Sequence, residues 1–148
     1  MDRILLILDK LDANNKHMLE DLKPLIKAKG AEIFYSFFIE IPFQYPIDTE
    51  DKYFKKNFDL SEQVLKSFEK EMNLRKISKS RLIGGIFKVR DLSFGIIEKA
   101  IEYSADLVVI PERIIKSKST FNKFNGSLAV NKVMNDLNSS VMIWQDKG

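Results

Sequence analysis

The chain of 148 residues contains no cysteine and a single histidine, His17. Without cysteine there is no disulfide, no thiolate ligand for a metal and no thiol nucleophile. With one histidine, a His-based metal cluster or a Ser-His-Asp triad would depend on a single side chain. We therefore expect no metal site and no catalytic centre of these kinds.

Long hydrophobic runs are also lacking. The run from Ile4 to Leu8 is too short for a signal peptide or a membrane span, and no other run approaches about 18 apolar residues. We expect a cytoplasmic protein without membrane contact. The net charge of +3 is too small to indicate a partner by itself, and 45% hydrophobic residues in this length suit one domain, residues 1–148.

What the sequence does contain is a regular alternation of apolar runs and amphipathic segments. Runs typical of strands occupy 4–8, 31–40, 80–89, 105–112 and 141–144, and helical spacing occupies 13–28, 59–72, 93–104 and 127–137. This order predicts an α/β protein with a parallel sheet, helices on both faces and right-handed crossovers.

Several residues should set the helix boundaries. Pro24 should kink or divide the first helix, and Gly30 should end it. Asp59 and Glu62 have capping-box spacing and should open the second helix. The inward faces expected for the second and third helices consist of Leu60, Val64, Leu65, Phe68 and Met72, and of Ile96, Ile97, Ala100 and Ile101.

Two segments interrupt the pattern. Gly84-Gly85 should mark a bulge or close packing in the third strand rather than a binding loop. Residues 41–58 contain two prolines and five aromatic residues. This segment is either a lid packed on the protein's own helices or a platform for base stacking, and the lack of interleaved basic residues on a defined sheet face disfavours the platform.

The order of elements resembles that of the universal stress protein family. Residues 105–110 (ADLVVI) resemble the family's fourth strand, Gly126-Ser127 the end of its phosphate loop, and residues 140–144 its closing strand. Asp9 matches an aspartate that such proteins place beside adenine and ribose. The resemblance implies a doubly wound, five-stranded sheet of order 3-2-1-4-5 with an adenine-nucleotide alpha-hydrolase-like (Rossmann-like) fold. It also implies homodimers paired through the last strand and, in one branch of the family, bound ATP.

The chain departs from that family in the phosphate loop. Pro111 and Ile114 stand where the first two glycines would be, and the loop is two residues longer before Gly126. Glycine suits those places because backbone amides must approach the phosphates closely, often at positive φ. Proline has no N–H, and a β-branched residue resists positive φ. We therefore expect no cofactor, with ATP or AMP held by side chains as the alternative.

Ligands of doubly wound sheets gather at the carboxyl ends of the strands, here between the first and the fourth. The candidate ligand residues at that edge are Asp9, Phe38, Ile110, Arg113, Lys116, Gly126 and Ser127. Residues 113–134 hold five basic residues and no acid. These either form an anion site that replaces the glycine cradle or belong to a solvated loop. Asp9 and Ser127 could equally cap their own turns.

These observations favour a non-enzymatic, universal-stress-protein-like protein with a regulatory or binding role in the stress response. The apolar closing strand would be exposed at the sheet edge of a monomer and should pair with its copy in a homodimer. The residues expected at this contact are Val141, Met142, Ile143 and Trp144.

The alternative is an adenine-nucleotide-binding protein or weak ATPase that uses the basic side chains of residues 113–123. Against it, no pyrophosphate loop follows the first strand, no Walker loop occurs, and no pair of carboxylates is placed for Mg²⁺. A nucleic-acid-binding module is disfavoured because the basic residues form two groups at opposite edges of the sheet. Those groups are Lys88 and Arg90 with the 113–123 loop, and Arg75, Lys76, Lys79 and Arg81.

Overall fold

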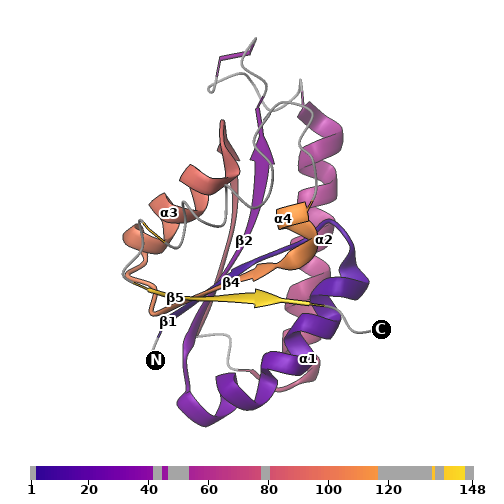
Figure 1. Ribbon diagram of the computed structural model, residues 1–148. Helices are drawn as coiled ribbons and strands as arrows, with labels where there is room; N and C mark the ends of the chain where they lie inside the picture. The colour runs from indigo at the N-terminus through magenta and orange to yellow at the C-terminus, as the bar shows by residue number, and fades with distance from the viewer. Residues whose placement is uncertain are drawn as a thin grey trace.

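The computed structural model describes residues 3–41, 45–46, 54–77, 81–116, 135 and 139–145, with the backbone alone at 28, 29 and 116. The elements in Figure 1 are β1 (Arg3–Ile7), α1 (Asp12–Lys29), β2 (Glu32–Glu40), α2 (Lys55–Leu74), β3 (Leu82–Val89), α3 (Leu92–Glu102), β4 (Leu107–Pro111), α4 (Glu112–Lys116) and β5 (Ser140–Trp144). The five strands form one parallel sheet in the order β3-β2-β1-β4-β5. The predicted fold class is confirmed.

Strand β1 lies at the centre of the sheet, and its residues alternate between two apolar layers. Ile4 and Leu6 pack with side chains of α1 and α2, whereas Leu5 and Ile7 pack with side chains of α3. Figure 1 shows α1 and α2 on one side of the sheet and α3 on the other. Burial on both faces explains why the sequence of this strand is a continuous apolar run.

Helix α1 follows the predicted boundaries. It runs through Pro24 without being divided, and Gly30 ends it with a φ of 60° and an N–H bonded to the carbonyl of Ile26. That left-handed conformation favours glycine, so this helix end is confirmed. His17 is exposed on the same helix.

Helix α2 begins one turn earlier than predicted, and the prediction that Asp59 and Glu62 form a capping box at its start is wrong. The helix starts at Lys55, after Phe54, and no side chain caps it. Neither proline nor glycine separates Lys55 from Asp59, so nothing in that stretch prevents helix formation. Asp59 therefore lies inside the helix rather than before it.

The inward faces of α2 and α3 each differ from the prediction at one residue. Leu60 is exposed, and Ser61 is buried in its place, with its hydroxyl donating to the carbonyl of Asn57 at 2.6 Å. Ile101 is 65% exposed, although Ala100 beside it is buried. Leu60 and Ile101 each lie one position along the helix, about 100° of rotation, from the line of buried residues.

The glycine pair of β3 is packed closely, as the sequence predicted. A Cβ atom on Gly84 would lie 2.5 Å from Cζ of Tyr35, and one on Gly85 would lie 2.5 Å from Cζ of Phe87. Both distances are shorter than van der Waals contact, so neither position has room for a side chain while these rings stay in place.

After β4 the structure differs from the expected loop. Pro111 is the last residue of β4, in register with Trp144, and the helical turn α4 starts at Glu112. A five-residue helix is too short to give a periodic signal in a sequence. The predicted helix at 127–137 lies outside the described residues. No helix among the described residues has both the length and the apolar character needed to cross a membrane.

Candidate functional site

The candidate site lies where β2 extends beyond the end of its neighbour β1. Their register ends at Ile7 opposite Ser36, and the last bond between them runs from the N–H of Leu8 to the carbonyl of Ser36, at 2.9 Å. Strand β2 continues to Glu40. This step in the sheet, at the carboxyl ends of its strands, is where ligands of doubly wound sheets bind.

A pocket of about 220 Å³ occupies this step. It is bounded by the end of β1, the end of β2, the start of α3 and the helical turn α4. Its apolar lining consists of Ile7, Leu8, Phe37, Phe38, Leu92 and Ile114. Phe38 packs in turn against Phe87 of β3, with 5.7 Å between the ring centroids. The apolar walls therefore belong to sheet and helix residues held by the core.

Four charged residues complete the lining: Asp9, Lys10, Glu40 and Arg113. Asp9 is almost fully buried, whereas the side chain of Arg113 is 47% exposed. Nε of Arg113 lies 3.6 Å from Oδ2 of Asp9, which is an ion pair without a hydrogen bond. Two acids and two bases make the formal charge of this lining zero.

Asp9 is held by two asparagines from the start of α1. Asn15 forms a pair of hydrogen bonds with the backbone of Asp9: its Oδ1 accepts from the N–H at 2.8 Å, and its Nδ2 donates to the carbonyl at 2.7 Å. Asn14 donates from Nδ2 to Oδ2 of Asp9 at 3.0 Å. These bonds satisfy buried polar groups, so they both organise the turn and fix the carboxylate at the pocket.

Both interpretations of Asp9 are thus compatible with its position, because it shapes the turn and also lines the pocket. Asn14 and Asn15 were missed in the sequence. The signal that could have found them is "LDKLDANN", where Asp and Asn beside a strand end are typical of turns held by side chains.

The structure brings three of the seven candidate residues together at the pocket: Asp9, Phe38 and Arg113. Ile110 lies in the core that packs on α3 and does not line the pocket. Lys116 ends α4, and its side chain is not described; Gly126 and Ser127 lie outside the described residues. Ligand contact by these residues remains a prediction.

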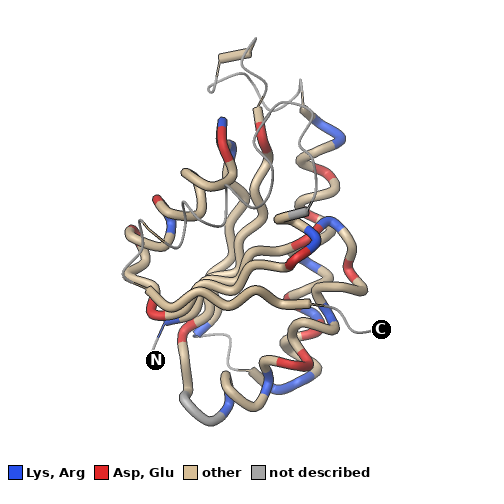
Figure 2. Tube along the Cα trace, viewed as in Figure 1, with Lys and Arg blue, Asp and Glu red and all other residues tan. Residues whose placement is uncertain are grey.

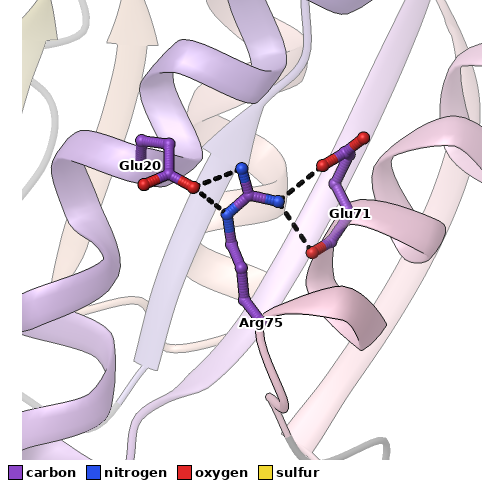
Figure 3. A network of polar contacts seen from close by, with 3 residues as sticks. All are labelled: Glu20, Glu71 and Arg75. Atoms are coloured by element: carbon purple, nitrogen blue, oxygen red, sulfur yellow. Dashed lines mark hydrogen bonds and ion pairs between the residues drawn. The ribbon is translucent and has the colours of Figure 1, made fainter.

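Two arginines outside the pocket, Arg90 and Arg75, contact neighbouring groups. Arg90 donates from Nη1 to the carbonyl of Ile41 at 3.3 Å. Arg75, at the opposite edge of the sheet, lies between Glu20 of α1 and Glu71 of α2 (Figure 3), with 2.6 Å from its Nη1 to Oε2 of Glu71. The hydrogen bond from Arg75 lowers the pKa of the Glu71 carboxyl.

Charges of both signs alternate along α1 and α2 in Figure 2. This mixture gives no single-sign stripe over those two helices of the kind that nucleic-acid-binding proteins present. Among the described residues, no group of three or more Asp, Glu or His side chains is arranged to hold a metal ion.

The sequence matches no family model, and no curated protein is significantly similar to it. Solved structures do match over nearly the whole chain. A universal stress protein from Burkholderia pseudomallei aligns with a TM-score of 0.67 at 16% identity, covering 97% of this chain and 95% of that one. One from Archaeoglobus fulgidus in complex with dAMP aligns with a TM-score of 0.62 at 13% identity, covering 97% of each chain.

A third match is a universal stress protein in complex with cAMP, with a TM-score of 0.61 at 13% identity, covering 96% of this chain and 94% of that one. At such identities the comparisons concern the fold. The chain has the fold of the universal stress proteins, and the resemblance inferred from its sequence is confirmed at that level.

Proposed function

We propose that this chain is a non-enzymatic regulatory or binding protein of the universal stress type, cytoplasmic and dimeric, without that family's usual ATP binding. The observation that carries the proposal is the conformation after β4. Pro111 is still part of that strand, and α4 begins at the next residue. A glycine cradle would have to occupy the same stretch of backbone.

The side chains of this stretch support the same conclusion. Pro111 has no N–H to offer a phosphate, and it is buried, in register with Trp144. Ile114 packs against the core on the α3 side and also lines the pocket, so its branched side chain occupies space near the phosphate position.

The second candidate is binding of ATP or AMP by basic side chains. Arg113 at the pocket favours it, as do the neighbours in complex with dAMP and cAMP. A nucleotide held this way would contact a guanidinium rather than backbone amides.

The dimer proposal concerns β5, which is an edge strand in the described sheet. Met142 is 36% exposed on this strand, as a contact with a second copy requires. The ring of Trp144, in contrast, is buried and donates from Nε1 to Oδ2 of Asp21 at 2.7 Å. Trp144 would therefore contribute to the dimer through its backbone, and Met142 through its side chain.

Calorimetric titration with Mg-ATP and with AMP tests the proposal. We expect no binding at millimolar nucleotide and no ATP turnover faster than a few per minute. Mass spectrometry of the purified protein under native conditions should find no copurified nucleotide. Bound ATP or AMP whose affinity falls at least tenfold in Arg113→Gln would support the second candidate instead.

Light scattering tests the dimer separately, and a dimer is expected at micromolar concentration. Met142→Lys should shift the mass toward that of a monomer, because charge on an edge strand opposes pairing. A monomeric wild type would contradict this part of the proposal.

A further inference from the structure

The pocket contains a buried carboxylate that can accept further hydrogen bonds. The side chain of Asp9 is 5% exposed. Its carboxylate accepts from Nδ2 of Asn14, at 3.0 Å, and Nε of Arg113 lies 3.6 Å from it. A carboxylate offers about four lone-pair positions, so the Asp9 carboxylate can accept further hydrogen bonds from a ligand in the pocket.

Arg113 supplies a donor group beside that carboxylate. Its guanidinium makes an ionic contact with Asp9 through Nε. The two terminal nitrogens form the fork that binds a carboxylate with two parallel hydrogen bonds. Arg113 is also half-exposed, so a ligand can reach it from solvent.

The rest of the pocket suits a compact apolar group. Phe37, Phe38, Leu92 and Ile114 offer hydrocarbon surface and no charge. A volume of about 220 Å³ lies below the range of roughly 300–1,000 Å³ common for pockets that hold drug-sized ligands. The charged lining is balanced, with Lys10 and Arg113 opposite in sign to Asp9 and Glu40. Neither a polyanion nor a polycation matches that balance.

We infer that this pocket takes a compact zwitterion, a free amino acid with an apolar side chain. The ligand's carboxylate binds the guanidinium of Arg113, its ammonium group donates to Asp9, and its side chain contacts the apolar wall that includes Phe38 and Ile114. This inference rests on the proposed function, because it names the ligand class for a site without a phosphate cradle.

Isothermal titration with L-leucine and L-phenylalanine tests the ligand class, with blocked derivatives as controls. N-acetyl-L-leucine lacks the ammonium group, and L-leucinamide lacks the carboxylate. Each derivative should bind at least tenfold more weakly than L-leucine, as expected for loss of one charge-assisted hydrogen-bonded contact. Equal binding of the derivatives, or no binding of either amino acid at 10 mM (about the weak end of measurable affinity), overturns the inference.

Arg113→Gln tests the assigned partner. It should weaken L-leucine binding about tenfold or more without weakening L-leucinamide, because leucinamide has no carboxylate to lose and its ammonium group no longer competes with Arg113 for Asp9. Lys66→Gln removes a charge from the exposed face of α2, away from the pocket, and should change neither affinity more than twofold. An Arg113→Gln protein that still binds L-leucine like the wild type overturns the assignment.

Titration with Mg-ATP under the same conditions distinguishes failure of the zwitterion inference from failure of the proposed function. If the amino acids do not bind and ATP does not bind, the zwitterion inference fails and the proposed function stands. If ATP binds, the proposed function fails. L-leucine binding without ATP binding supports both.

Discussion

The indole N–H of Trp144 donates a hydrogen bond of 2.7 Å to the carboxylate of Asp21, joining the last strand to the first helix across 123 residues of sequence. Trp144 is buried with side chains of α1 in the core on that side of the sheet. Edge strand β5 is thus attached to the rest of the protein by a side chain as well as by its pairing with β4.

Trp144→Phe should lower the free energy of unfolding by about 1–2 kcal/mol, mainly because it reduces the volume of a buried ring, and to a smaller extent because it removes a hydrogen bond to the exposed carboxylate of Asp21. Urea unfolding followed by circular dichroism measures this. Tyr45→Phe is the control, since it removes a polar group from an aromatic ring that is 41% exposed, and it should stay within about 0.5 kcal/mol of wild type. A Trp144→Phe protein as stable as Tyr45→Phe would contradict the role of the bond.

Gly84→Ala should destabilise the protein by about 1–3 kcal/mol through overpacking. The added Cβ would meet the ring of Tyr35, which is buried and whose hydroxyl donates to Oε1 of Glu69 at 2.6 Å. The ring therefore has little freedom to move. Chemical denaturation of Gly84→Ala and Gly85→Ala makes a matched comparison.

Gly85→Ala should lower the free energy of unfolding by less than Gly84→Ala does. Its added Cβ meets the ring of Phe87, which is only partly buried and can shift. If the two substitutions cost the same, the hydrogen bond to Glu69 does not hold the ring of Tyr35 in place.

The stability of the protein should fall in acid partly through Glu71. The hydrogen bond from Arg75 lowers the pKa of this carboxyl below its ordinary value. A depressed pKa in the folded state stabilises the protein above the unfolded-state value, about 4.3, and this contribution is lost as pH falls below that value. Since the Glu71–Arg75 pair is local and partly exposed, we expect it to contribute about 0.5 kcal/mol to the free energy of unfolding.

Unfolding free energies measured between pH 3 and pH 7 test this contribution. Glu71→Gln should show a shallower loss toward acid than wild type, whereas Glu98→Gln, at an exposed position of α3, should keep the wild-type slope. Parallel curves for wild type and Glu71→Gln would exclude the effect.

The sheet was predictable from the sequence because central strands buried on both faces need continuous apolar runs, as in Ile4 to Leu8. The strand order came from the family resemblance. The start of α2 was not predictable from capping signals, because Lys55 follows aromatic residues that belong to no periodic pattern. Leu60 and Ile101 show the limit of spacing arguments: a residue one position from the buried line has the same apolar character but faces solvent.

The site residues placed by strand ends could be predicted from the sequence. The contacts that depend on how side chains pair in the folded chain could not. Asp9 follows β1, and Phe38 lies near the end of the neighbouring parallel strand β2, so topology alone places them at one edge. Arg113 reaches the pocket only because α4 turns the chain back immediately after β4. The bonds of Asn15 with Asp9 span six residues and have no periodic signature.

Asn15→Ala should destabilise the protein more than Asn14→Ala does. Asn15 is buried and satisfies both the N–H and the carbonyl of Asp9, so its loss leaves two buried backbone groups unpaired, costing about 2–4 kcal/mol. Asn14 donates one bond to a carboxylate that Arg113 also approaches, so its loss should cost about 1 kcal/mol. Thermal and urea unfolding of both variants provide the comparison. If Asn15→Ala is no less stable than Asn14→Ala, the backbone of Asp9 does not depend on that amide, and the turn that positions the carboxylate is held by other contacts.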